Sequence, residues 1–293
     1  IQKTVRDYGA LEGESLTLGS DLAINAFFEE NITDYLILIL LILIALTFMD
    51  ERKKGLWSIV HIGAQGRLSL GLWRITIIFM TSLLSCVILY GSKLLTSFYL
   101  YGGEEGLGRL IQSMPVFKEF WIPMSVSQLL WLYLGVKILG SFLIGMLLWL
   151  LLSSATYFNI AVASLSIFLG VEYTFYTLIR DSSILVLLKY INIFAYVEQK
   201  QFFQHYMNLN IFNEPIQSGK LLLMLTPILL LIFIAVDIYI QCRKYPIDSP
   251  SFISRALDNI QKEINGRIKI TGIFLNELYK NLNIEKLLNY MKK

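Results

Sequence analysis

The sequence predicts an all-α protein that forms a polytopic bundle of membrane-spanning helices. Hydrophobic residues make up 55% of the 293 residues and charged residues only 16%, with a mean hydropathy of +0.59. A soluble domain with this composition would leave a large apolar surface in water. Continuous apolar runs also recur at lengths near the roughly 20 residues that cross a ~30 Å hydrocarbon core as a helix. Transmembrane β-strands would instead alternate over about ten residues. The five predicted spans are 35–49, 72–95, 128–152, 157–179 and 221–241.

The first span is short, because Asp34 and Asp50 bracket only 15 apolar residues. Its helix must either extend through Ile32 or cross a thinned bilayer. The preceding residues, 1–34, hold two basic and seven acidic groups and are predicted to be an extracellular segment at the end of a larger ectodomain. Two alternatives stay open for this segment. Either an upstream helix and ectodomain precede it, or the numbering starts at the first ordered residue.

The distribution of charge predicts the orientation. Residues 50–74 hold five basic and two acidic groups, and residues 243–293 hold ten basic and five acidic groups. Because basic residues are enriched in cytoplasmic loops, both segments are predicted to be cytoplasmic. The chain is therefore expected in a cell membrane, a bacterial plasma membrane, with its C-terminus in the cytoplasm. In the tail, 242–293, apolar residues recur at helical spacing between lysines, as in an amphipathic helix on a membrane surface or packed on its own protein.

Charged residues inside spans are costly and are therefore candidate functional residues. A short turn joins the third and fourth spans, which predicts that Lys137 and Glu172 lie at similar depth and form an intramembrane ion pair. Asp237 is expected to pair with Arg243 or Lys244 near the cytoplasmic edge. The two histidines and two cysteines show no ligand spacing, so no metal is assigned. Small residues on one side of the third span allow another helix to approach closely. They are Gly135, Gly140, Ser141 and Gly145.

The cytoplasmic segment 50–70 carries the candidate coupling residues. Its charged start is followed by a short amphipathic stretch between glycines, which predicts a helix lying on the membrane, and a simple juxtamembrane anchor would have the same pattern. A Glu-x-x-x-Gly element directly after a span, then a short helix, then Gly-Arg before the next span, resembles the permease subunits of second-type ABC exporters. The matching residues are Glu51, Gly55, Leu56, Trp57, Gly66 and Arg67.

The resemblance implies how the chain is organised and driven. The five visible spans correspond to helices two to six of a six-helix permease, in the subgroup with an ectodomain between its first two helices. Residues 183–196 correspond to a short re-entrant helix on the outer face. Segment 50–70 corresponds to the coupling helix, which docks on a cytoplasmic ATPase subunit. The resemblance also implies a second permease copy or homologous half as a partner, and ATP and Mg²⁺ bound by the ATPase rather than by this chain.

The chain itself is expected to be a transport subunit and not an enzyme. Its sequence contains no Gly-x-x-x-x-Gly-Lys-Ser/Thr loop for nucleotide phosphates and no nucleic-acid motif. Within the spans it has no paired carboxylates and no nucleophile with a neighbouring base. Two alternatives stay open, an ion-coupled secondary carrier and a non-transporting assembly or sensory subunit. The substrate stays open as well.

Overall fold

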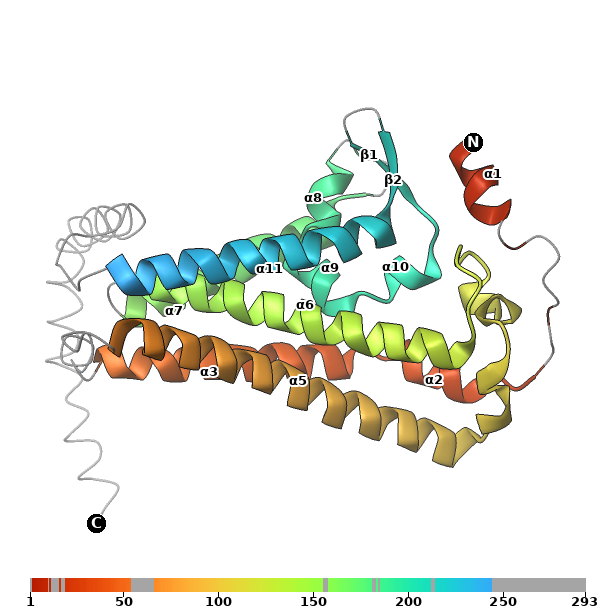
Figure 1. The fold of residues 1–293 in the computed structure, drawn as a ribbon, viewed down its shortest axis with the longest axis horizontal. Coiled ribbons are helices and arrows are strands. Elements are labelled where there is room, and N and C mark those ends of the chain that lie inside the picture. Colours follow the sequence, from red (N-terminus) through yellow and green to blue (C-terminus); the bar gives the residue numbers. More distant parts are fainter. Residues whose placement is uncertain are drawn as a thin grey trace, which may run out of the picture.

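The computed structural model describes residues 2–9, 11, 16, 19–53, 66–154, 158–180, 183, 185–211 and 214–243. Within these residues the chain is an elongated helical bundle with one small β-hairpin (Figure 1). Five of the described helical stretches are long and apolar enough to cross a membrane, which confirms the predicted fold class. They start or end together at the left of Figure 1, which we call the tail end of the bundle, while the shorter elements lie along the other half of the bundle, which we call the cap end.

Four of the long helices extend beyond their predicted spans by a few residues or more, whereas the described α7 lies within its predicted span, 157–179. In these four helices the helical backbone bonding continues past the ends of the apolar runs. The bounds are Ile32–Lys53 for α3, Gly66–Tyr101 for α5, Val126–Ser154 for α6, Phe158–Leu178 for α7 and Ser218–Arg243 for α11. Helix α3 thus takes the alternative that extends through Ile32.

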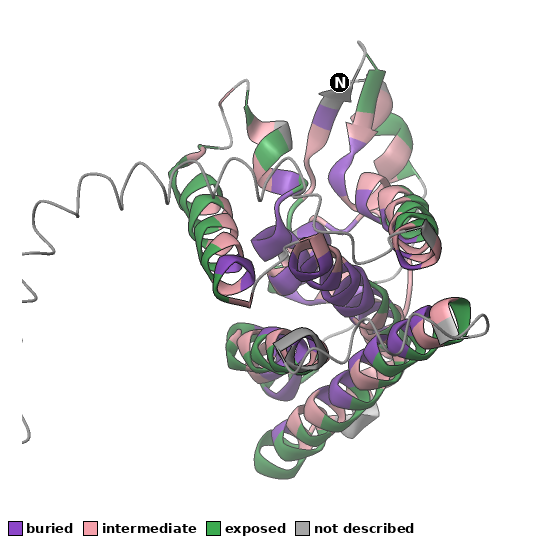
Figure 2. Cartoon of the chain, turned by 90° about the vertical axis from the view of Figure 1, so that its left-hand side faces the viewer, coloured by how far each residue is buried: buried purple, intermediate pink, exposed green. Residues whose placement is uncertain are grey.

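Helix α6 is the central helix of the bundle. In its apolar window 61% of the residues are buried, against 17–33% for the other four spans. In Figure 2 the buried residues gather at the centre while the surrounding helices turn exposed faces outward. Small residues make this position possible, because a Cβ added at Gly145 would lie 2.6 Å from Ile78 Cγ2 and 3.2 Å from Leu41 Cδ2. Helices α3 and α5 therefore approach α6 most closely at this glycine.

The acidic N-terminal segment is not simply a polar extension outside the bundle. Helix α2, Leu22–Glu29, buries Ile24, Phe27 and Phe28 in the same apolar core as the spans. Glu30 is extended, with φ −94° and ψ 139°, so the helical path breaks between α2 and α3. Residues 22–49 are therefore one apolar stretch in two helical pieces.

The cap end is built from short elements between the spans. Three 3₁₀ helices lie between α5 and α6, and α8, α9, α10 and a hairpin lie between α7 and α11. In the range of the predicted re-entrant helix, 183–196, the described residues form two short helices with a break at residues 191–192, and the second helix continues to Glu198. Their bounds are Glu104–Gly108 (η1), Ile111–Ser113 (η2), Pro115–Phe117 (η3), Val186–Tyr190 (α8), Ile193–Glu198 (α9), Gln201–Gln204 (α10), Asn208–Ile211 (β1) and Glu214–Gln217 (β2). The two strands are antiparallel, with Leu209 opposite Ile216.

Helix α1, Gln2–Gly9, lies against the cap and is held there by polar contacts. Tyr206 donates to Asp7 at 2.8 Å, Lys3 donates to Asn208 at 2.9 Å, and the rings of Tyr8 and Tyr206 lie 5.1 Å apart. Burial raises the pKa of the Tyr206 hydroxyl above its usual value, so this group remains a neutral donor to Asp7.

Candidate functional site

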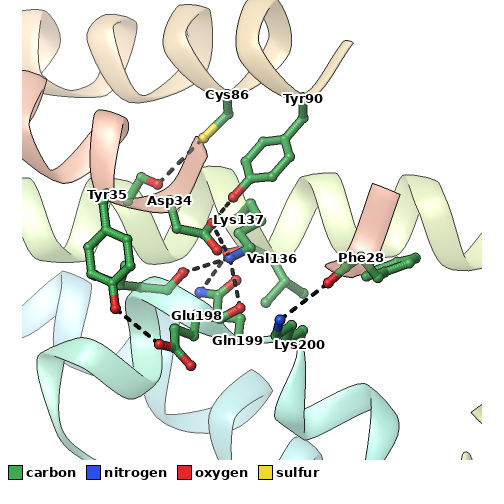
Figure 3. A network of polar contacts seen from close by, with 12 residues as sticks. Phe28, Asp34, Tyr35, Cys86, Tyr90, Val136, Lys137, Glu198, Gln199 and Lys200 are labelled. Atoms are coloured by element: carbon green, nitrogen blue, oxygen red, sulfur yellow. Dashed lines mark hydrogen bonds and ion pairs between the residues drawn. The ribbon is translucent and has the colours of Figure 1, made fainter. Parts of the chain in front are cut away.

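Lys137 is the most deeply buried lysine among the described residues, with 2% of its surface exposed. It lies in α6 and its Nζ has three acceptors. It contacts Asp34 Oδ1 at 2.6 Å, the carbonyl of Val197 at 2.6 Å and the carbonyl of Glu198 at 2.9 Å (Figure 3). An ammonium group has three donor hydrogens, so this lysine is fully satisfied inside the protein.

Asp34, which the sequence placed just outside the first span, is the ionic partner of Lys137. It lies in the first turn of α3, is 6% exposed and also accepts a hydrogen bond from the Tyr90 hydroxyl of α5. A carboxylate is favoured at a helix N-terminus, where the unpaired amides create positive potential. The ion pair therefore joins α3, α5 and α6 at one level of the bundle.

Aromatic rings complete the surroundings of the Lys137 ammonium. Its Nζ lies 5.6 Å from the ring centre of Tyr90 and 5.2 Å from that of Tyr133, both within the range of cation–π attraction. A cavity of about one water molecule, lined by Asp34, Ser141 and Val197 among others, adjoins the pair. The Lys137 ammonium group is therefore enclosed, and its three N–H donors are already bonded to protein acceptors.

The predicted ion pair between Lys137 and Glu172 is wrong. Glu172 instead accepts a hydrogen bond at 3.0 Å from the backbone N–H of Ile193, the first residue of α9. Lys137 binds the carbonyls at the other end of the same helix. A carboxylate at the N-terminus and an ammonium at the C-terminus both complement the helix dipole. The two residues do lie on neighbouring spans, but each contacts one end of α9 and they do not contact each other.

Side chains around the end of α9 add to this attachment. The carboxylate of Glu198 accepts from Tyr35 at 3.1 Å and from Tyr176 at 2.6 Å, which links it to α3 and α7. Gln199 follows in the left-handed conformation, with φ 46°, and donates to the carbonyl of Val136 at 3.3 Å. A Cβ at Gly140 would lie 1.9 Å from Gln199 Nε2, so this glycine makes room for the glutamine.

Two further lysines bind the carbonyls at the break between α2 and α3. Lys200 donates to the carbonyl of Phe28 at 3.3 Å and of Glu29 at 3.0 Å, and Lys93 donates to that of Glu30 at 2.6 Å. The last carbonyls of a helix lack intrahelical partners, and here lysines supply them. Lys93 therefore reaches from α5 toward the break between α2 and α3.

A second buried polar cluster lies at the tail end. Arg74 of α5 is 2% exposed, and its guanidinium carbon lies 5.0 Å from the ring centre of Trp149 on α6 and 6.0 Å from that of Phe48 on α3. Asp237 of α11 is fully buried and accepts a hydrogen bond from Trp149 Nε1 at 2.9 Å. Gln241 contacts both charged groups, at 3.4 Å each.

The expected partners of Asp237, Arg243 and Lys244, are not covered by the described side chains. Asp237 points toward the bundle axis, where the indole N–H of Trp149 is its closest donor. Arg243 is the last residue of α11, and its side chain lies outside the described residues, as does Lys244 entirely. The distance of Asp237 from the end of the span does not give its rotation about the helix axis. The sequence therefore did not show that Asp237 faces the interior of the bundle.

The candidate coupling residues lie within residues 54–65, which are outside the described residues, or next to them. Gly55, Leu56 and Trp57 lie outside the described residues. Glu51 belongs to the last turn of α3, although its side chain is not described, and Gly66 and Arg67 are the first residues of α5. The helices thus extend into segment 50–70 from both sides and leave 54–65 between them.

The sequence reasoning missed most of these contacts. Arg74 was counted only as a loop charge, and Tyr90 and Trp149 were not singled out. The sequence carried one signal for these contacts, a basic residue that could meet a polar residue of another span. Several such pairs were possible, so the signal did not select the right one. Among the described residues no group of three or more His, Cys, Asp or Glu side chains is arranged to hold a metal ion.

The fold and the buried charges define the class of this protein as a multi-pass membrane helical bundle. Comparison with known proteins does not narrow that class, because no family model, no curated protein and no solved structure matches the chain.

Proposed function

We propose that this chain is the membrane-spanning permease subunit of an ATP-driven exporter, and that segment 54–65 together with the adjoining helix ends contacts a separate ATPase subunit. The observation that carries the proposal is the packing of α3 and α5. The two helices flank this segment, and both pack on the central helix α6. A force applied at the connection would therefore reach the most buried part of the bundle directly.

The absence of a nucleotide-binding loop from the sequence supports a division of labour. A permease of this kind moves substrate while a partner binds ATP and Mg²⁺ and hydrolyses the ATP. A second permease copy or a homologous half would complete the path for the substrate. In this proposal the tail end faces the cytoplasm, as the basic residues of segment 50–74 indicate.

Co-purification from native membranes tests the proposal. The tagged chain is expected to retain an ATPase subunit, and Glu51→Ala or Trp57→Ala is expected to reduce the bound ATPase at least several-fold. Trp131→Ala is the matched control, because Trp131 is a 75% exposed tryptophan in the second turn of α6, the central helix, and lies outside the candidate coupling residues. A preparation that transports substrate without any ATPase partner would overturn the proposal.

One observation favours a second candidate, an ion-coupled secondary carrier. Such carriers often bind their coupling ion at a broken helix, and α2 and α3 form a broken helix here. In this chain, however, the carbonyls at the break bind Lys93 and Lys200, which a metal cation would have to displace. Uptake into vesicles driven by a sodium or proton gradient, without ATP, would favour this candidate over the first.

A further inference from the structure

The exposed side chains change in character at the break between α2 and α3. Those of α3 are mostly apolar and include Leu36 at 46% and Leu43 at 53% exposure. Helix α2 instead buries apolar side chains in the protein and ends in exposed Glu29, which exposed Glu30 follows. Of the residues of α2, all of which the structure describes, Leu22 alone is large, apolar and exposed. The apolar surface of α2 is therefore used in the protein core, whereas much of that of α3 is left for lipid.

Helix α5 shows the same change beside Lys93. Between Arg74 and Lys93 its exposed side chains are mostly apolar, and after Lys93 the polar Thr96 and the amphipathic Tyr99 alternate with leucines. Lys93 donates to the carbonyl of Glu30 at 2.6 Å. The changes on α5 and at the α2–α3 break therefore lie at the same level of the bundle.

The stretches that lead from this level to the tail end have the length of a hydrocarbon core. Residues 31–49, 75–92 and 221–242 are 19, 18 and 22 residues long, and the structure describes every side chain in them. Their only charged residues, Asp34 and Asp237, are buried. About 20 helical residues cross a ~30 Å hydrocarbon core, whereas α5 has 36 residues and the apolar stretch of α2 and α3 has 28.

We propose that the cap-side boundary of the hydrocarbon core crosses the bundle at Glu30, Lys93 and Lys220. Helix α3 then crosses the membrane without α2, which lies with the cap in the headgroup region and the water beyond it. The eight residues of α5 after Lys93 reach about 12 Å past the boundary. The ammonium of Lys220 lies 4.2 Å from the ring centre of Trp121, and tryptophan is enriched at the membrane–water interface. This inference goes beyond the proposed function and does not depend on it.

The boundary also gives the depth of the buried charges. Asp34 lies four residues after Glu30, so its ion pair with Lys137 lies about 6 Å inside the hydrocarbon core. Glu172 of α7 is half-buried and accepts a hydrogen bond at 3.0 Å from the backbone N–H at the start of α9. These charged groups are therefore bound by protein groups, as a lipid environment requires, while the exposed carboxylates of Glu29 and Glu30 lie at the boundary or beyond it.

The accessibility of spin labels on two helices tests the boundary. The full chain carries Cys86→Ala and Cys242→Ser, and one cysteine at a time is introduced at an exposed position and labelled. The protein is reconstituted into liposomes of phosphatidylcholine and phosphatidylglycerol. Oxygen concentrates in the hydrocarbon core, whereas a neutral nickel chelate stays in water, so the ratio of the two accessibilities reports which medium surrounds each label.

Each helical path supplies a matched pair of positions. Leu43→Cys in α3 and Leu84→Cys in α5, both at side chains 53% exposed, lie inside the boundary. Leu22→Cys in α2 and Tyr99→Cys in α5, at side chains 62% and 89% exposed, lie outside it. The ratio of oxygen to nickel accessibility should be several-fold higher at positions 43 and 84 than at positions 22 and 99.

A high ratio at all four positions would overturn the boundary, because hydrocarbon would then cover α2 and the whole of α5. Low accessibility to both reagents at positions 22 and 99 would overturn it as well, since protein rather than water would cover them. Leu100→Cys, at a side chain 64% exposed, replaces Tyr99→Cys if that variant does not fold. The measurement needs no ATPase, so a failed boundary leaves the proposed function standing, and the loss of ATPase binding leaves the boundary standing.

Discussion

Lys137 and Asp34 are stabilised by more than their mutual attraction. Asp34 lies at the N-terminus of α3 and Lys137 binds the C-terminal carbonyls of α9, so each charge also faces the favourable end of a helix dipole. Two aromatic rings cover the ammonium group. A buried pair with this many partners is costly to break from either side, because the remaining charge loses its compensation.

Replacing one member of the pair should therefore lower the stability of the protein strongly, and replacing both should lower it less. Lys137→Met or Asp34→Asn alone should each lower stability by about 3–5 kcal/mol, the usual cost of leaving a buried charge unpaired. The double variant should lose much less than the sum. Thermal unfolding of purified protein in detergent measures all three, and the difference gives the coupling between the residues.

Glu172 provides the matched control for this cycle. Because Glu172 binds the N-terminus of α9 and not Lys137, Glu172→Gln and Lys137→Met should couple only through the helix that both hold, and therefore less strongly than Lys137→Met and Asp34→Asn. A strong coupling between these two, together with none between Lys137 and Asp34, would contradict the observed pairing.

The sequence identified Lys137 and Glu172 as important but could not choose their partners. Depth along a span follows from counting residues, and the two do lie on adjacent spans. Rotation about the helix axis does not follow from it, and Lys137 turns toward α3 and α9. Its true partner, Asp34, is 103 residues away and lay at the edge of a predicted span, where a carboxylate needs no partner.

At the level of elements, α6 occupies the centre because its small residues face its neighbours. Of the predicted small residues, Gly140 and Gly145 lie in close contacts, whereas a Cβ at Gly135 would meet nothing within 4 Å. The pattern of glycines therefore predicted the packing of this helix in general. Only the structure separates the glycines that are needed from the one that is not.

Two glycine substitutions on α6 should have opposite outcomes. Gly140→Ala would force the 1% exposed Gln199 to move and should destabilise the protein by about 1–3 kcal/mol, as overpacking usually does. Gly135→Ala should be neutral or slightly stabilising, since alanine favours helix by about 1 kcal/mol over glycine. Thermal unfolding of the two variants decides the matter, and equal losses would contradict the assignment.

Helix α1 depends on few contacts with the cap, and Tyr206 makes two of them. Tyr206→Phe keeps the ring but removes the donor to Asp7. Hydrogen exchange of the α1 amides should then become several-fold faster, because the local opening free energy falls by about the 0.5–1.5 kcal/mol of one hydrogen bond. Tyr99→Phe, at an 89% exposed tyrosine of α5, is the control and should leave α1 exchange unchanged.

For the whole molecule, hydrophobicity predicted the all-α bundle and all five spans, because length and apolar content are local properties of the chain. It did not predict that α2 would join the apolar core. Residues 22–29 contain only one short apolar stretch, Glu29 and Glu30 interrupt the pattern before α3, and Asp34 interrupts it again in the first turn of α3. Lysines from distant segments compensate the break at Glu30, and no local rule anticipates them.

The orientation of the bundle remains a prediction from charge, and thiol labelling of intact cells tests it. Cys242 lies at the tail end, and His205→Cys would place a thiol at the cap, at a side chain that is 70% exposed. A membrane-impermeant maleimide should label position 205 in intact cells and Cys242 only after permeabilisation. Cys86 is buried and should react with neither treatment. The reverse pattern would invert the proposed orientation.

The distance in sequence between Asp34 and Lys137 also bears on biosynthesis. Helix α3 enters the membrane while α6 is still unsynthesised, so the carboxyl group of Asp34 has no Lys137 to pair with at that stage. When α6 follows, a lysine within an inserting helix costs about 2.5–3.5 kcal/mol at the helix centre, and the waiting carboxylate can offset part of that cost. The ion pair is therefore expected to form during membrane insertion itself, as the step that joins the early and late parts of the nascent chain.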